Sequence, residues 1–216
     1  MKKYILLCLF ILLTACTAQI QSQALDVPYF SQEGPSCIQA QMRMALKYYY
    51  PEKDYSQEML DQMTERNGNQ WTWFSQAIPV LIEEGLDTYY YSTTPYEELN
   101  PTFVNSYYGD DGPLINSVTN WGALQKSIEY IMETDRYQNK KLDWQEVEQA
   151  FQEGSVILMI IDYNVLINKD GPYMGHGITI TNINETHVTF HNSNMNPNQV
   201  ATKEQFIEAW DAPGSQ

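Results

Sequence analysis

The sequence predicts an α+β fold in which a C-terminal antiparallel sheet packs against a buried N-terminal helix. Two patterns support this prediction. Apolar residues at helical spacing recur through the first two thirds of the chain, whereas β-branched runs joined by a tight turn fill the last third. The chain has 216 residues, of which 43% are hydrophobic, so we expect one sizeable core and a single domain after the N-terminal segment.

The first residues predict a targeting signal. Lys2 and Lys3 precede an apolar run from Ile5 to Leu13, which is shorter than the roughly 20 residues of a membrane-spanning helix. The following Leu-Thr-Ala-Cys, which ends at Cys16, resembles the lipobox of bacterial lipoproteins. An ordinary signal peptide that is cut nearby is the alternative.

The lipobox resemblance implies how the N-terminal part is divided. Residues 1–15 would be the lipoprotein signal peptide, and residues 16–24 would be the lipidated Cys16 and a short polar tether. Residues 25–216 would form the folded domain. The expected location is the bacterial cell envelope, where the lipid holds the protein on the membrane facing outward, in the periplasm or at the cell surface.

The first helix of the domain is expected over residues 37–50. Ser36 stands at the N-cap position, Cys37 opens the helix, and Pro51 ends it. Apolar residues occupy two sides of this helix, which is typical of a buried helix. The periodicity predicts further helices over residues 56–66, 72–84, 121–134 and 144–153, a strand over 86–91, a loop over 107–113, a buried strand over 156–161, a loop over 162–175, and a hairpin of strands over 176–183 and 187–192.

The charge and the cysteines exclude several classes of function. Twelve Lys and Arg against 27 Asp and Glu give a formal charge of −15, which argues against a nucleic-acid partner. Of the three cysteines, Cys8 would leave with the signal and Cys16 would carry lipid, so Cys37 is the expected free thiol. No expected helix carries a pair of His or Cys ligands four residues apart, and we expect neither a metal nor another cofactor. Oligomeric state stays open.

Cys37 is the candidate nucleophile. A thiol at a helix N-terminus lies near unpaired N–H groups and the positive end of the helix dipole, so we expect its pKa to be lowered. The Cys37 N–H and the amide of Gln32 are candidate donors to an oxyanion. The competing interpretation is a buried, inert cysteine.

His176 is the candidate base, with Asn192 as its partner. The hairpin turn at residues 184–185 brings residues 176–178 beside residues 191–193, and period-two alternation turns Asn192 inward. Asn192 is therefore expected to orient the His176 ring, with Asn194 as its rival. His187 and His191 are expected on the solvent face of the second strand.

These residues resemble a known family. The segment from Val27 through Gln32, followed by Ser36-Cys37 at a helix start, resembles papain-like cysteine peptidases of the bacteriocin-processing (double-glycine leader) type, as do Gly175-His176, the strand that ends at Asn192 and the segment from Lys203 to Trp210. The resemblance implies a papain-like fold, with Cys37 as nucleophile, His176 as base and acid, Asn192 as orienting residue and Gln32 as oxyanion donor. Ile38 replaces the usual Gly, Asn192 stands where Asp is frequent, and Gln32 lies one residue closer to the cysteine than usual.

The resulting hypothesis is an exported, membrane-anchored thiol hydrolase that cleaves a peptide or amide bond in a peptide or protein substrate. The main alternative is a catalytically inactive papain-like domain that binds peptides at the cell surface. A cell-wall endopeptidase of the other common papain-like lipoprotein class is disfavoured, because its Asp-Cys-Ser-Gly signature is absent.

Overall fold

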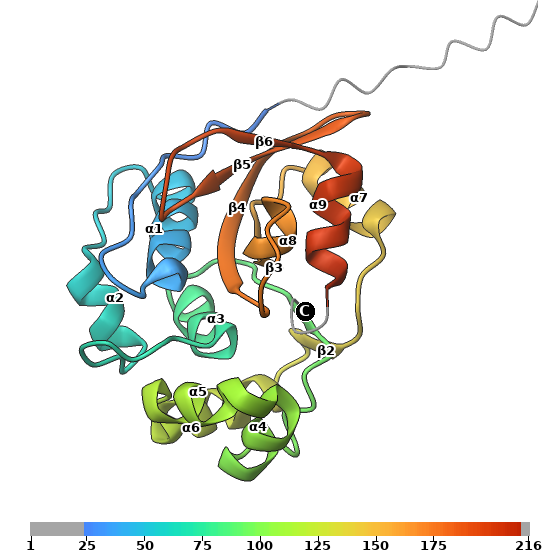
Figure 1. The fold of residues 1–216 in the computed structure, drawn as a ribbon. Coiled ribbons are helices and arrows are strands. Elements are labelled where there is room, and N and C mark those ends of the chain that lie inside the picture. The colour runs from blue at the N-terminus through green and yellow to red at the C-terminus, as the bar shows by residue number, and fades with distance from the viewer. Residues whose placement is uncertain (1–23, 213–216) are drawn as a thin grey trace, which may run out of the picture.

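A four-stranded antiparallel sheet lies at the centre of the computed structural model, which describes residues 24–212 (Figure 1). Its strands lie in the order β3, β4, β5 and β6, and each is antiparallel to its neighbour. Helices cover both faces of the sheet, so the predicted α+β class with an antiparallel sheet is confirmed. The strand bounds are Ile157–Asp162 (β3), Gly175–Ile183 (β4), His187–Asn192 (β5) and Gln199–Thr202 (β6).

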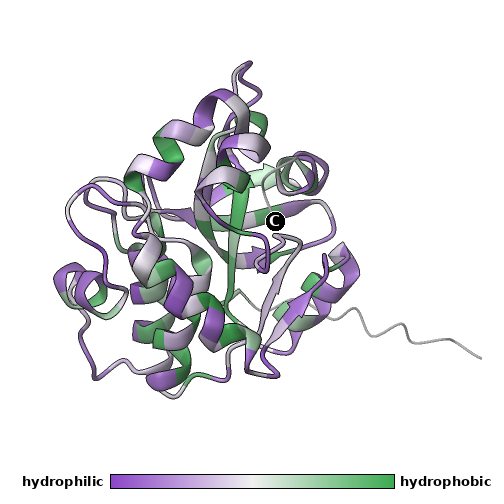
Figure 2. Cartoon of the chain, turned by 90° about the horizontal axis from the view of Figure 1, so that it is seen from below, coloured by the Kyte–Doolittle hydropathy of each residue, from purple (hydrophilic) through white to green (hydrophobic). Residues whose placement is uncertain are grey.

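One face of the sheet packs on the C-terminal helices α7 (Trp144–Gln152), α8 (Tyr163–Leu166) and α9 (Lys203–Asp211). Alternate residues of the strands, such as Ile178, Ile180 and Phe190, form an apolar layer against these helices. Burying such side chains stabilises the fold by roughly 1.5–3 kcal/mol each. Figure 2 shows hydrophobic residues gathered on the central strands and hydrophilic ones along the outer surfaces of the helices.

The opposite face packs on α1 (Cys37–Tyr49), which lies beside α2 (Gln57–Met63) and α3 (Phe74–Glu83). Met42 and Leu46 of α1 are fully buried, in the cluster that Leu158 and Ile160 of β3 join. The segment before α1 also crosses this region, because the Leu25 N–H donates to the Thr181 carbonyl. The predicted burial of the first helix is confirmed.

A lobe of short elements follows α3 and has its own apolar cluster. It contains β1 (Tyr90–Ser92), α4 (Pro101–Tyr108), the 3-10 helix η1 (Gly109–Asp111), α5 (Gly112–Val118), α6 (Trp121–Met132) and β2 (Tyr137–Asn139). Strands β1 and β2 pair in parallel. In Figure 1 the green helices α4 and α5 lie at the end of the molecule away from β6.

The loop expected over residues 107–113 is wrong, because this stretch is helical. The Asn100 side chain caps α4, and Pro113 occupies the first turn of α5, where its missing N–H costs nothing. Gly112 packs so tightly on the Asn105 backbone that a β-carbon would overlap it. Tertiary contact between α4 and α5 thus overrides local turn propensity.

The other predicted elements agree with the structure to different degrees. The helices expected over 37–50, 56–66, 72–84, 121–134 and 144–153 are present within three residues at each end. The strand expected over 86–91 begins only at Tyr90, and the loop expected over 162–175 contains α8. The signal peptide, Cys16 and all of the tether except Ala24 lie outside the described residues. Within residues 24–212, no helix is long and apolar enough to cross a membrane.

Candidate functional site

Cys37 opens α1 directly after the N-cap residue Ser36, as predicted. The Ser36 side chain does not cap the helix but lies in hydrogen-bond contact with Glu33 and Gln57. The N–H groups of Cys37 and Ile38 therefore stay directed at the Cys37 sulfur, and the Gly177 N–H approaches it from β4. The three N–H groups form a partial anion site around the sulfur.

Burial nevertheless raises the pKa of the Cys37 thiol above its ordinary value, although the three N–H groups and the Arg66 guanidinium act to lower it. The predicted lowering of the pKa is wrong. Loss of hydration disfavours the thiolate more strongly than the helix N-terminus and Arg66 favour it. At neutral pH the resting side chain is a protonated thiol.

His176 and Asn192 are hydrogen-bonded to each other, with 2.8 Å between His176 Nε2 and Asn192 Oδ1. The hairpin places Ile178 opposite Asn192, which is the register that the sequence predicts. Because a carbonyl oxygen only accepts, Nε2 carries the proton and Nδ1 keeps a lone pair. Asn192 is fully buried, and its Nδ2 donates to Gln199 Oε1 over 3.2 Å, which fixes the orientation of its amide.

Asn194, the rival to Asn192, is exposed, and its backbone N–H donates to the same Asn192 Oδ1. The His176 ring also lies edge-on against Tyr163, with 5.5 Å between ring centroids. Burial lowers the pKa of His176, while its bond to Asn192 acts to raise it. The ring is therefore neutral at pH 7 and able to accept a proton.

Gly177 joins the two halves of the site. A β-carbon built on Gly177 would lie 3.4 Å from the Cys37 sulfur, so Cys37 packs directly against the residue that follows His176. Because side chains alternate along β4, Gly177 faces α1, whereas the His176 side chain projects from the opposite face at the start of the strand. Among the described residues, no hydrogen bond links the Cys37 sulfur to the His176 ring.

Gln32 is not directed at the thiol. Its Nε2 donates to the Gly34 carbonyl over 2.7 Å, and its Oε1 accepts from Ser193 Oγ over 2.8 Å. These contacts tie the segment before α1 to the end of β5. Both polar atoms of the Gln32 amide are thus bonded to residues of these two segments, and neither is directed at Cys37.

The expectation of a solvent-exposed His191 is wrong, because His191 is 3% exposed. Its Nε2 donates to the Val27 carbonyl over 2.8 Å and its Nδ1 accepts from the Asn198 N–H over 3.1 Å. Period-two alternation places His191 on the face opposite Phe190 correctly, but the N-terminal segment covers that face. His187 is partly buried beside Thr186 at the start of β5.

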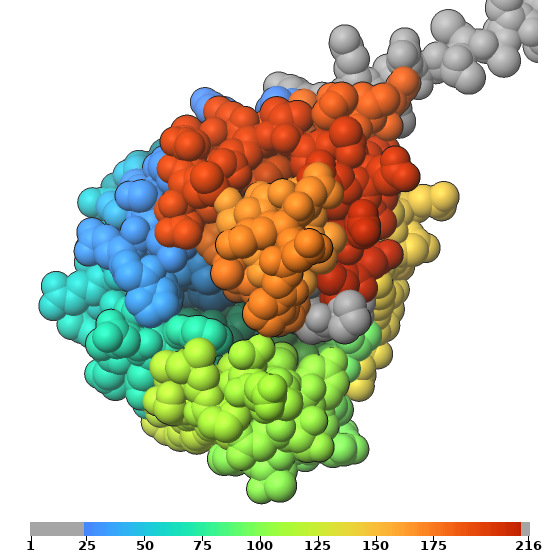
Figure 3. Space-filling model, in the orientation of Figure 1, coloured from blue at the N-terminus to red at the C-terminus, as the bar shows by residue number. Residues whose placement is uncertain are grey.

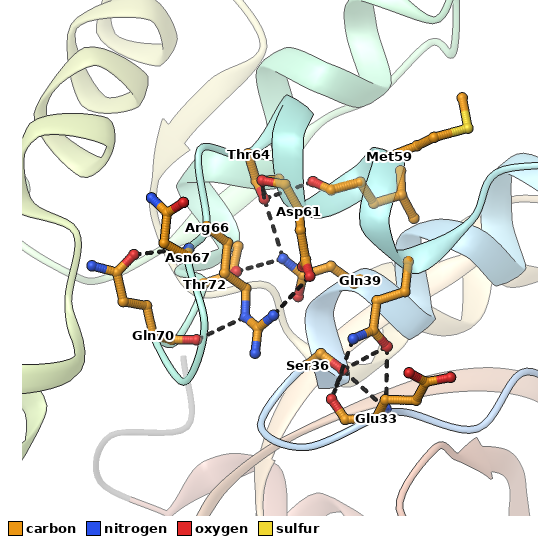
Figure 4. Close-up of polar contacts among 12 residues, drawn as sticks. Glu33, Ser36, Gln39, Met59, Asp61, Thr64, Arg66, Asn67, Gln70 and Thr72 are labelled. Carbon is orange, nitrogen blue, oxygen red and sulfur yellow. Dashed lines mark hydrogen bonds and ion pairs between the residues drawn. The ribbon is translucent and has the colours of Figure 1, made fainter.

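Two polar side chains near Cys37 were not singled out in the sequence. Gln41 lies one helical turn after Cys37 on the same side of α1, and Arg66 follows α2. Figure 4 shows Arg66 held by Asp61 and by the Gln70 carbonyl, beside Gln39, whose amide donates to Thr64 and Thr72. Gln41 could have been found from its i, i+4 spacing to Cys37, which places both residues on one side of the helix. No feature of the sequence indicated that Arg66 lies near Cys37.

Figure 3 shows the molecular surface hollowed where the blue N-terminal segment, the orange segment after β3 and the green helices α4 and α5 meet. Large apolar side chains are exposed in the segments that flank His176, namely Ile167, Met174 and Met195. Within residues 24–212, no group of three His, Cys, Asp or Glu side chains is arranged to hold a metal ion.

Comparison of the chain with models of protein families, with curated proteins and with solved structures gave no match.

Proposed function

We propose that this chain is a thiol hydrolase that cleaves a peptide or amide bond, with a papain-like arrangement of Cys37, His176 and Asn192. The observation that carries the proposal is the 2.8 Å bond from His176 to buried Asn192, beside the glycine on which the Cys37 sulfur packs. A lone histidine or a lone cysteine has many structural uses. An imidazole with a fixed tautomer next to a thiol at a helix N-terminus is typical of nucleophilic catalysis.

The neutral resting state determines the order of the proton transfers. As the Cys37 sulfur bonds to the substrate carbonyl carbon, His176 Nδ1 takes the thiol proton, and Asn192 holds the resulting imidazolium. The imidazolium then gives this proton to the leaving amine, which produces a thioester on Cys37. Water, deprotonated by His176, hydrolyses the thioester and restores the thiol.

The backbone N–H of Cys37 is the first donor to the oxyanion in this scheme. Gln32 supplies a second donor only if its amide turns away from the Gly34 carbonyl. The Gln32 contacts, together with the raised pKa of Cys37, favour the second candidate function, an inactive domain that binds peptides.

Labelling with a biotinylated peptide vinyl sulfone separates the two functions. The folded wild-type chain is expected to be labelled, Cys37→Ala not at all, and His176→Ala about 10²–10⁴-fold more slowly, because general base catalysis contributes that factor. His187→Gln is the matched control and keeps the wild-type rate. Labelling that occurs only after denaturation, or at equal rates in wild type and His176→Ala, would favour the binding domain.

The proposal includes export and a lipid on Cys16. In a bacterial host, the wild-type chain is expected to incorporate radiolabelled palmitate and to sediment with membranes. Cys16→Ser is expected to lose both properties, with Cys8→Ser as the control that keeps them. A Cys16→Ser chain that matures to the same length and stays on membranes would contradict the lipobox.

A further inference from the structure

The Gln41 side chain reaches from α1 to the backbone of the central sheet. It is 1% exposed, and its Nε2 donates to the carbonyl of Ile178 in β4 and lies 3.4 Å from the carbonyl of Met159 in β3. Met159 and Ile178 are register partners, so one side-chain amide links α1 to two paired strands.

The other end of the same amide has no donor. Gln41 Oε1 is buried and lacks a hydrogen-bond partner among the described residues. A β-carbon at Gly177 would overlap this oxygen, and the same β-carbon would lie 3.4 Å from the Cys37 sulfur. The oxygen and the sulfur therefore converge on Gly177 from successive turns of α1.

We infer that Gln41 is a positioning residue, which fixes the first turn of α1 against β4 and sets the placement of Cys37 relative to His176. This inference rests on the proposed hydrolase function. An amide bonded to β4 two residues beyond His176 allows α1 little freedom to slide along the strand. Replacing Gly177 by any larger residue would push α1, with Cys37 and Gln41, away from β4.

The unpartnered oxygen has a second, electrostatic effect. It is the negative end of an amide dipole that meets Gly177 at the same point as the sulfur does, and at such short range in a buried site we expect it to disfavour the thiolate. The groups that act in the other direction are the N–H groups of Cys37, Ile38 and Gly177 and the guanidinium of Arg66, which is itself paired with Asp61. His176, which is neutral at pH 7, adds no charge to this balance.

Gln41→Leu tests both effects, because it keeps similar bulk but removes both the anchor and the dipole. Alkylation of Cys37 by iodoacetamide at pH 7 is expected to become several-fold faster, with its pH profile moved to lower pH. Labelling by the peptide vinyl sulfone is expected to become at least roughly tenfold slower, since misplacement of a reacting group has such costs. A purely structural role would move both rates in the same direction.

Gln39→Leu is the matched control. Gln39 is also 1% exposed on α1, but its amide bonds Thr64 and Thr72 rather than the sheet. It is expected to lose stability without separating the two rates. If Gln39→Leu produces the same opposite changes, or if Gln41→Leu moves both rates together, the inference is overturned.

Gln41→Glu keeps the shape of the side chain and is the second variant if the leucine substitution does not fold. Its carboxyl oxygen, which would meet Gly177 where the Cys37 sulfur does, is expected to move the alkylation profile to higher pH, opposite to the leucine variant. An unmoved profile, or one moved to lower pH, overturns the inference. A wild-type chain that the vinyl sulfone does not label argues instead against the hydrolase, since the iodoacetamide profiles still report on Gln41.

Discussion

The two faces of the central sheet differ in what they bury. The face toward α7 and α9 is a continuous apolar layer that includes Ile178, Ile180 and Phe190. The face toward α1 and the N-terminal segment carries Gly177, Thr179, Thr181 and His191 on the same two strands, all of them buried. Both threonine hydroxyls lack a hydrogen-bond partner among the described residues.

The apolar face mainly stabilises the fold, whereas the face toward α1 carries part of the candidate site. A buried hydroxyl without a partner costs about 1–3 kcal/mol, so the face toward α1 gives up stability that the apolar face supplies. Small and polar residues on that face let α1 approach β4 closely enough for Cys37 and Gln41 to reach Gly177. His176 and Asn192 lie at the end of the apolar face, where the two environments meet.

The largest change in stability is expected from the apolar face. Phe190→Ala removes a ring that is 2% exposed and packs 5.6 Å from the Phe206 ring, and it is expected to lower the free energy of unfolding by about 3–5 kcal/mol. Urea denaturation measures this change. Val200→Ala on β6, where Val200 is 62% exposed, is the control and should stay within about 0.5 kcal/mol. Equal losses would show that the face is not close-packed.

Asn192→Ala tests the boundary between the faces. It removes the acceptor of the His176 proton and leaves the ring free to turn, so vinyl sulfone labelling should slow, but less than in His176→Ala. Asn194→Ala should change the rate little, because the Asn194 side chain is exposed and only its backbone contacts Asn192. A larger loss of rate in Asn194→Ala than in Asn192→Ala would show that Asn194, and not Asn192, orients the His176 ring.

Acid is expected to destabilise both faces through one histidine on each. Burial lowers the pKa of His176 and of His191, so the unfolded chain binds more protons than the folded chain as pH falls through about 6.5. The free energy of unfolding should therefore decrease below that pH, by at most about 1.4 kcal/mol per pH unit for each histidine. Protonated His191 would also lose the bond that its Nδ1 accepts from Asn198.

Urea denaturation at a series of pH values measures this dependence, and His191→Gln assigns it. The variant is expected to show a shallower decrease than wild type, whereas His187→Gln should not. A decrease that is unchanged in His191→Gln would assign the acid sensitivity to other groups.

The smallest effect is expected at Thr179. Thr179→Val keeps the shape of the side chain and removes a buried hydroxyl without a partner, so it should leave stability unchanged or raise it by up to about 1 kcal/mol. Thr202→Val is the contrasting control, because the Thr202 hydroxyl accepts from Gln205 as the N-cap of α9 and its loss costs about 0.5–2 kcal/mol. A clear loss at Thr179 would reveal a partner for that hydroxyl.

The sheet and the His176–Asn192 pair could be predicted because both follow from alternation along a strand. A two-residue period and a tight turn define which residues meet, and Asn192 was the inward polar residue that needed a partner. The burial of His191 could not be predicted in the same way, because alternation tells one face from the other but not whether a distant segment covers it. The Val27 segment does so here.

Local signals failed where packing decides the outcome. Gly109-Asp110-Asp111-Gly112-Pro113 is rich in turn-forming residues, yet it continues from α4 into α5 because Gly112 fits against Asn105. The pKa of Cys37 is a similar case. The sequence reveals a helix N-terminus, but the burial that raises the pKa depends on an apolar cluster that includes Leu158 and Ile160, far away in the chain.

The bond from Leu25 to Thr181 defines where the N-terminal segment meets the central sheet. Thr181 lies five residues along β4 from His176, or about 17 Å, and Leu25 is bonded to that distant end of the strand. A tether of residues 17–24 has a contour length of at most about 30 Å. If the proposed lipid is present, its point of attachment would therefore lie within that distance of the end of the sheet that is remote from Cys37.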